Sequence, residues 1–219
     1  MKKTCGMPPC PVGTIEKSPP FQRRVRVAVC CLLLLHLASP ANARILRVAQ
    51  DGDGTDGATW ETAFQSVGGA ILSATAGDEI WVKEGAYIEN LVLHPELSLL
   101  GGFSGNELGD QFNLRNWRER ETIISGPSLY NLSPDPIVTA ADGCVMDGFT
   151  LRYGTGGVYC EDASMEIRHC YIHRNQNGEG AGVFCISGGM IIEDCVFERN
   201  QGWDGVGAYF IISFVVVHH

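Results

Sequence analysis

Beyond its first 43 residues, the chain has few basic side chains. Residues 1–43 contain six of the 16 lysines and arginines but only one of the 25 acidic residues. The remaining residues carry 10 basic and 24 acidic side chains, a formal charge of −14. Such a surface repels phosphate backbones and anionic lipid headgroups. We therefore expect neither nucleic acid nor an anionic membrane surface as a partner, which leaves cations, basic proteins and neutral glycans.

Long hydrophobic runs are also missing. The longest apolar run, residues 27–38, has 12 residues, whereas a helix needs about 20 to span a bilayer. The run follows a basic segment and precedes Ala41-Asn42-Ala43, a small-x-small cleavage pattern. We interpret residues 1–43 as a secretory signal peptide, with an uncleaved anchor as the alternative. This predicts a mature chain that begins at Arg44, has no transmembrane span and is secreted or displayed at the cell surface.

The second half of the chain repeats itself at an offset of 25 residues. From Gly157, the segment GVYCEDASMEIRHCYIHRNQNGEGA is followed by GVFCISGGMIIEDCVFERNQGWDGV and then by GAYFIISFVVV. A fixed period between about 20 and 50 residues indicates a solenoid. Apolar residues alternate within each unit, as Met165 and Ile167 do, which is the period of a strand. The repeat predicts an all-β fold, a parallel β-helix with coils of 21–25 residues over residues 78–219.

These repeats also carry a family resemblance, which covers residues 137–217. The units GGVYC…MEIRHCYIHRN and GVFC…MIIEDCVFERN resemble the right-handed parallel β-helix repeats of the pectin-lyase-like superfamily. FERN at residues 197–200 is similar to the FxxN element of polymorphic outer-membrane protein repeats. The resemblance implies a right-handed coil and a location outside the cell, in association with an outer membrane or free. It is informative about fold and says little about activity.

Residues 44–77 are expected to form the N-terminal lead-in of the β-helix. RILRVAQ at residues 44–50 alternates and predicts the first strand. A helix from Thr59, its N-cap, to about Ala74 would place Phe64, Val67, Ala70 and Ile71 on one apolar face. The segment DGATWETAFQSVGGAILSA resembles the short helix that closes the N-terminal end of many such proteins. We therefore expect an N-terminal capping helix.

The aspartates between the first strand and this helix could hold calcium. Asp51, Asp53 and Asp56 alternate with glycine, as oxygen ligands do in EF-hand loops. The twelfth position of such a loop is Thr62, where the motif requires glutamate. We therefore favour a glycine and aspartate turn, expect no cofactor, and keep calcium as the alternative.

Two kinds of residue are expected to stack on successive coils. Cys160 with Cys185, and Cys170 with Cys195, should form a ladder of small buried side chains, with disulfides as the alternative. No Cys-x-x-Cys pair occurs, so zinc is not expected. Asn175 and Asn200 should stack at a turn and bond to backbone groups there.

Residues that could perform catalysis are few. The repeat places His169 above Asp194, and Arg168 above Glu193. A histidine beside a carboxylate can be a general base, although on an exposed edge such a pair is more often a solvated ion pair. A catalytic groove would require acidic and basic side chains to converge from successive coils; the weak candidates are Asp142, Asp147, Arg152, Glu166, Arg168, His169 and Asp194.

The enzymes that the resemblance implies have signatures which this chain lacks. Arg115 and Arg118 flank Asn116 and Trp117 without the proline of the pectate-lyase RxPxxR element. The NTD, Asp-Asp and Gly-His-Gly elements of polygalacturonase-like hydrolases are absent. We therefore identify no catalytic site and expect a β-helix repeat protein with a structural, adhesion or glycan-binding role. Its partner would be an extracellular polysaccharide or another surface protein. The alternative is a polysaccharide lyase or glycoside hydrolase.

The last residues depart from the repeat. Phe210 replaces the cysteine of the two preceding units, and FIISFVVV brings apolar residues to outward positions. We interpret this as a chain truncated in mid-coil, and expect the sequence to be a piece of a longer protein, with a frame error as the alternative.

Overall fold

The computed structural model describes residues 43–109, 111–127, 135–211 and 213–218. The predicted signal peptide therefore lies outside the described residues, except for its last residue. The described residues belong to one unit, residues 41–219, and the account below concerns that unit alone. Among these residues, no helix is long and apolar enough to cross a membrane.

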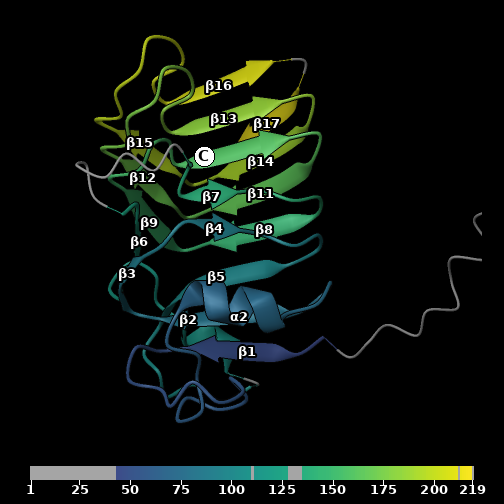
Figure 1. The fold of residues 1–219 in the computed structure, drawn as a ribbon, viewed down its shortest axis with the longest axis vertical. Coiled ribbons are helices and arrows are strands. Elements are labelled where there is room, and N and C mark those ends of the chain that lie inside the picture. Colours follow the sequence, from purple (N-terminus) through teal and green to yellow (C-terminus); the bar gives the residue numbers. More distant parts are fainter. Residues whose placement is uncertain (1–42, 110, 128–134, 212, 219) are drawn as a thin grey trace, which may run out of the picture. The chain divides into compact units, whose positions relative to one another are not determined.

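The unit is all-β, and its strands form three parallel sheets (Figure 1). Sheet A contains β1 (Ile45–Val48), β2 (Glu79–Lys83), β5 (Ser98–Phe103), β8 (Cys144–Asp147), β11 (Ser164–Arg168), β14 (Gly189–Glu193) and β17 (Phe214–His218). Sheet B contains β3 (Gly85–Ile88), β6 (Thr122–Ser125), β9 (Phe149–Arg152), β12 (Tyr171–His173) and β15 (Val196–Glu198). Sheet C contains β4 (Leu91–Val92), β7 (Val138–Thr139), β10 (Val158–Glu161), β13 (Val183–Ile186) and β16 (Ala208–Ile211).

From β2 onward the chain visits sheets A, B and C in a fixed order. Each return to a sheet adds a strand parallel to the strand of the previous round. The predicted offset of 25 residues is confirmed by the pairs Cys160↔Cys185 and Met165↔Met190. The offset of 21 is confirmed by Ile172↔Leu151. This arrangement is compatible with a β-helix, because a parallel return to the same sheet requires a crossover.

Apolar side chains from all three sheets fill the space between them. Met146, Phe149 and Leu151 point inward, and at most 2% of each is exposed. Burial of a side chain of this size stabilises the fold by about 1.5–3 kcal/mol. The core continues without interruption from Leu46 in the first strand to Ile192 in β14.

The described helix α2 spans Val67–Ser73 and is shorter than predicted. Ser66 is its N-cap, and the Ser66 hydroxyl accepts a hydrogen bond from Gly69 N at 3.1 Å. The prediction that Thr59 begins the helix is wrong. The Thr59 hydroxyl instead accepts a bond from Thr62 N at 3.2 Å, and residues 59–66 are turns and bends with one bridge to β1. Such local bonds from threonine compete with helix formation.

The predicted apolar face of α2 is largely confirmed. Val67, Ala70 and Ile71 are buried in the core between the sheets. Phe64 precedes the helix, yet it still packs against the same core because it pairs with Val48 in β1. The carboxylate of Glu89 accepts bonds from Val67 N and Gly68 N at 2.9 and 2.8 Å, which satisfies two donors of the first turn.

The asparagine ladder is confirmed. Asn175 is fully buried; its Nδ2 donates to Leu151 O at 3.1 Å and its Oδ1 accepts from Gly154 N at 2.9 Å. Asn200, one coil later, accepts from Asn175 N at 3.0 Å and donates to Ile172 O at 2.9 Å. The ladder satisfies backbone groups at the end of sheet B that strand pairing leaves without partners.

The cysteines occupy the stacked positions that the repeat predicts. Cys160 pairs in register with Cys185, and Cys170 N lies 3.5 Å from Cys195 Sγ. These four cysteines and Cys144 are free thiols, and only Cys195 is not fully buried.

Candidate functional site

A loop of residues 104–121, here called the Trp117 loop, lies over the corner where the chain passes from sheet A to sheet B. Arg115 fixes the loop, because its Nη2 lies 2.8 Å from Asp147 Oδ1 at the end of β8. Both side chains are buried, with 7% and 9% exposed. The other guanidinium nitrogen, Nη1, donates to Asp147 O at 3.2 Å and to Gly101 O at 3.3 Å. The loop is therefore held by charge-assisted bonds within the protein.

Two glycines make room for Trp117 beneath this loop. At Gly102 a Cβ would lie 2.6 Å from the Cα of Trp117, and at Gly148 it would lie 2.9 Å from the Trp117 Cβ. Asn116 N donates to Gly102 O at 2.9 Å, which brings the loop backbone against β5. Any larger residue at these glycines would push Trp117 away from the corner.

The loop also has internal support. Glu107 is buried and accepts bonds from Ser104 N and Gly105 N at 2.8 and 3.0 Å. Burial on its own raises the pKa of Glu107, but the hydrogen bonds from Ser104 and from the backbone of residues 106 and 107 together outweigh it, and the pKa is lowered. Arg120 lies 3.3 Å from the same carboxylate. The loop is therefore a packed structure that presents Trp117 in one place.

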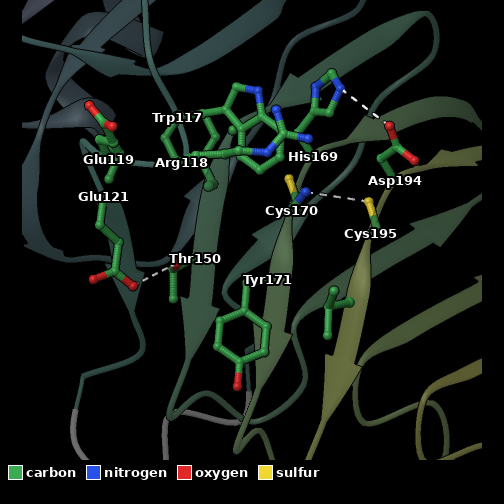
Figure 2. Close-up of a pocket in the computed structure, with 14 residues that line it drawn as sticks. Trp117, Arg118, Glu119, Glu121, Thr150, His169, Cys170, Tyr171, Asp194 and Cys195 are labelled. Carbon is green, nitrogen blue, oxygen red and sulfur yellow. Dashed lines mark hydrogen bonds and ion pairs between the residues drawn. The ribbon is translucent and has the colours of Figure 1, made fainter.

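The Trp117 groove lies between this loop and sheet B and has a volume of about 740 Å³ (Figure 2). Its floor comes from β9, β12 and β15, and one side comes from the corners that precede β12 and β15. The residues used below are Trp117, Arg118, Glu119, Glu121, Thr150, His169, Tyr171, Asp194 and Cys195. Aromatic, cationic, acidic and hydroxyl groups therefore face one concave surface, as in most ligand sites.

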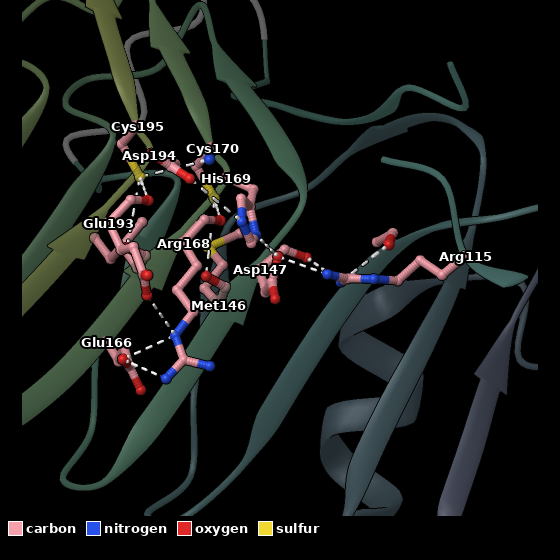
Figure 3. A network of polar contacts seen from close by, with 12 residues as sticks. Arg115, Met146, Asp147, Glu166, Arg168, His169, Cys170, Glu193, Asp194 and Cys195 are labelled. Carbon is pink, nitrogen blue, oxygen red and sulfur yellow. Dashed lines mark hydrogen bonds and ion pairs between the residues drawn. The ribbon is translucent and has the colours of Figure 1, made fainter. Parts of the chain in front are cut away.

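His169 connects the groove to the buried ion pair (Figure 3). Its Nδ1 lies 2.8 Å from Asp147 Oδ1, and its Nε2 lies 3.8 Å from Asp194 Oδ2. A carboxylate only accepts hydrogen bonds, so Nδ1 carries a proton toward Asp147 and Nε2 is directed to the side of Asp194. The imidazole also stacks on Trp117, with 4.6 Å between ring centroids and 24° between planes. Arg115, Asp147 and Trp117 together set the orientation of His169.

The backbone of His169 is left-handed, with φ of +50°. Gly148 and Asp194 occupy the same corner in the neighbouring coils and have φ of +83° and +48°. Positive φ is uncommon for residues other than glycine. Here it recurs at the same corner in consecutive coils, so it belongs to the geometry of the coil and is not a sign of strain stored at a site.

Groups along the groove wall are engaged with protein partners of their own. Glu121 accepts a bond from the Thr150 hydroxyl at 2.9 Å, and Glu119 accepts one from Asn116 Nδ2 at 2.9 Å. The guanidinium carbon of Arg118 lies 4.0 Å from the centroid of the Trp117 ring, a cation–π contact. The groove wall is therefore lined by polar groups, and the indole of Trp117 adds an apolar surface to it.

No family model, curated protein or solved structure matches this chain. The groove is therefore interpreted from its own chemistry.

Two thiols border the groove. Burial raises the pKa of the Cys170 thiol well above its ordinary value. The pKa of Cys195 is lowered, chiefly by a hydrogen bond from the Cys170 thiol. Cys195 lines the groove and is partly exposed, whereas Cys170 is buried, so Cys195 is the more accessible thiol.

The structure brings together three of the predicted catalytic candidates. Asp147, His169 and Asp194 meet at the corner described above. Arg168 does not join them, because its guanidinium binds Glu166 at 2.5 Å and lies 3.4 Å from Glu193 on sheet A. The sequence repeat predicted that Arg168 stacks on Glu193 and His169 on Asp194, and both pairs are confirmed to lie in contact.

The remaining candidates lie apart from this corner. Asp142 accepts a bond from Ser164 N at 3.0 Å at the turn that leads into β11. The guanidinium carbon of Arg152 lies 5.3 Å from the ring centroid of Tyr153, beyond the other end of sheet B. Of the weak candidates named from the sequence, Asp147, His169 and Asp194 therefore share one corner, and the others lie elsewhere.

The three calcium candidates do not converge either. Asp51 forms an ion pair with Lys83 at 2.7 Å, Asp53 accepts a bond from Thr55 N, and Asp56 accepts one from Ala58 N. Within the described part of the chain, no group of three or more His, Cys, Asp or Glu residues is placed to hold a metal ion. The bonds at Asp53 and Asp56 span two residues, as in the glycine and aspartate turn that we favoured.

Sequence reasoning missed the residues that build the groove. Arg115 and Arg118 were considered only as a failed lyase signature, and Trp117 and Tyr171 were not considered as groove residues. One usable signal was a tryptophan between two arginines in a mostly polar loop. No repeat offset connects this loop to the coil that it covers, so the contact could not be found from spacing.

Proposed function

We propose that the chain is a right-handed parallel β-helix repeat protein of the pectin-lyase-like type that binds polysaccharide in the Trp117 groove. The fixed order of visits to three parallel sheets supports the β-helix. In this proposal α2 is the N-terminal cap, since Val67, Ala70 and Ile71 cover the core below β4. The protein would act outside the cell or at its surface, as the predicted signal peptide indicates.

The groove itself carries the proposal. A sugar ring has an apolar face of C–H groups and a rim of hydroxyls, and an indole packs well on such a face. His169 and Arg118 pack on the indole of Trp117 and hold it in a fixed orientation, so a sugar would contact the part of the ring that they leave uncovered, with Tyr171 and Thr150 on the floor opposite. Carboxylates, a guanidinium and an imidazole around them supply acceptors and donors for hydroxyls. The charge of −14 beyond residue 43 also disfavours polyphosphate ligands.

Affinity electrophoresis of the mature chain in gels that contain soluble neutral or acidic polysaccharides tests this proposal. We expect retardation in at least one gel, and loss of that retardation in the Trp117→Ala variant. Leu72→Ala is the matched control, because Leu72 is 83% exposed on α2 and lies outside the groove. Trp117→Phe keeps an aromatic ring and should retain partial retardation. Equal mobility of the wild type in gels with and without each polysaccharide would refute the proposal.

A second candidate function, acid–base catalysis on the same polysaccharide, is favoured by one observation. His169 is oriented by Asp147, and its Nε2 is directed toward Asp194 on the groove wall. A lyase or hydrolase of this kind would release unsaturated uronates or reducing ends. The His169→Gln variant should abolish that release, whereas His94→Gln, at an exposed histidine elsewhere, should not. Product release that persists in His169→Gln would exclude this role.

A further inference from the structure

A second surface feature lies where two successive coils leave sheet B. Residues 175–180 (NQNGEG) and 200–205 (NQGWDG) form loops that stack at the 25-residue offset. Backbone bonds join them, among them Asn177 N to Gln201 O at 2.9 Å and Gly180 N to Asp204 O at 3.0 Å. Because the buried ladder of Asn175 and Asn200 anchors both loops, their backbone is held in place.

The two loops differ at one informative position. Where the first loop has Gly178, the second has Trp203, whose side chain is 91% exposed. Trp203 N donates to Gly178 O at 2.6 Å, and a Cβ at Gly178 would lie 3.7 Å from the indole Cε3. The edge of the indole therefore rests on a glycine, and the rest of the ring faces solvent. Tryptophan is highly buried on average, so an indole this exposed offers an unusually large apolar surface to a ligand.

The surroundings of Trp203 define what would bind there. A concave surface of about 460 Å³ is lined by Trp203, two glycines and three primary amides, those of Gln176, Asn177 and Gln201. Gln176 Nε2 donates to Gln201 Oε1 at 3.4 Å. Each primary amide has two donor hydrogens and one acceptor oxygen, so this contact uses only a fraction of their capacity. The site pairs an apolar ring with neutral groups that both donate and accept.

The charges nearby set the class of ligand. No charged side chain lines this surface, and the nearest residues in the two loops, Glu179 and Asp204, are acidic and exposed. Among the lining residues an acidic sugar would find no cationic partner, and the carboxylates of Glu179 and Asp204 would repel it. The arginines that precede the two loops, Arg174 and Arg199, contact Tyr153 Oη and Glu198. A hydroxyl is both donor and acceptor, as the amides are, and a pyranose ring offers the indole an apolar face.

We propose that Trp203, Gln176, Asn177 and Gln201 form a binding site for a neutral oligosaccharide, separate from the Trp117 groove. The two sites share no residue. They lie at opposite ends of the short strands β12 and β15, so one polysaccharide chain could contact both. The Trp203 site does not depend on the function proposed for the groove, because it rests on different residues.

Fluorine NMR of the mature chain labelled with 5-fluorotryptophan tests this inference. The chain has four tryptophans, so four resonances are expected, and single Trp→Phe variants assign them. The probes are cellohexaose and mannohexaose as neutral oligosaccharides, and trigalacturonate as the acidic comparison. We expect at least one neutral probe to shift the Trp203 resonance at millimolar concentration, while trigalacturonate leaves it in place.

Variants separate the two sites. Gln201→Ala should weaken the response of the Trp203 resonance by about tenfold or more, the factor expected for losing hydrogen bonds to a ligand. Trp117→Ala should leave that response unchanged. A Trp203 resonance that ignores both neutral probes, or that responds only to trigalacturonate, overturns the inference. A response confined to the Trp117 resonance would overturn the Trp203 site and support binding in the Trp117 groove. A response confined to the Trp203 resonance would support the Trp203 site and count against binding in the groove.

Discussion

Replacing Arg115 with methionine tests whether one buried ion pair holds the Trp117 loop over the groove. Methionine keeps most of the apolar stem of arginine and removes only the guanidinium. Asp147 then loses the contact at 2.8 Å and two further bonds near it disappear, to Asp147 O and Gly101 O. The carboxylate stays buried with His169 as the ionisable partner that still contacts it.

The size of the effect follows from burial. Removing one partner of a buried pair costs about 3–5 kcal/mol, because the other charge is left without compensation. His169 still contacts Asp147, so we expect the lower end, about 3 kcal/mol. Arg168→Met is the matched control, since Arg168 pairs with Glu166 where 40% and 21% of the side chains are exposed. An exposed pair contributes about 0–1 kcal/mol.

Urea unfolding followed by circular dichroism measures both variants. A double-mutant cycle with Asp147→Asn isolates the pair, and we expect a coupling free energy of about 0.5–3 kcal/mol. The Trp117 resonance should also move in Arg115→Met and stay in place in Arg168→Met. Equal unfolding midpoints for the two arginine variants, or a coupling near zero, would refute the argument that this ion pair anchors the loop.

Three further predictions concern the coil, its N-terminal end and the groove. Asn175→Ala should lower the free energy of unfolding by about 1–3 kcal/mol per buried group left unsatisfied, whereas the exposed Gln176→Ala should change it little. Burial raises the pKa of Asp78, but bonds from Arg44 and Thr75 outweigh it and lower the pKa to about 2 from 3.8. The stability from this contact is therefore complete above pH 3.8 and is lost as the pH falls toward 2. In Asp78→Asn the urea unfolding midpoint should depend less on pH between 3.8 and 2 than in the wild type, and an equal pH dependence in both proteins would contradict this prediction. Gly148→Ala should displace Trp117, because the new Cβ would lie 2.9 Å from the Trp117 Cβ, and should abolish retardation in polysaccharide gels. Gly143→Ala changes another glycine of positive φ and should be retarded as the wild type is.

The coil could be predicted from sequence because its contacts repeat. Once Cys160 is aligned with Cys185, every strand of that coil has its partner, and the alternation of Met165 and Ile167 tells which side is buried. The asparagine ladder follows from the same offset. Helix α2 was found with the wrong start, because Thr59 binds Thr62 while Ser66 caps the helix. Hydroxyl side chains can play either role, and the sequence offers both.

The groove could not be predicted in the same way. Its roof comes from a loop that occurs once, and the ion pair of Arg115 with Asp147 joins residues 32 positions apart with no repeat to signal it. The floor residues Thr150 and Tyr171 were placed on strands, yet nothing in their pattern shows what covers them. A second clue was glycine: Gly102 lies within β5 and Gly148 lies between β8 and β9, at points where Trp117 comes too close for a Cβ.

The corner that carries Gly148, His169 and Asp194 has a consequence for design. Its backbone keeps the same left-handed turn whether the residue is small, aromatic or acidic. Charge and shape can therefore be altered at Asp194 while the register of the strands on either side is preserved, whereas Gly148 must stay glycine because a Cβ there would lie 2.9 Å from the Trp117 Cβ. Asp194, which lines the groove, is therefore the position of this corner at which the groove surface can be redesigned without disturbing the strands.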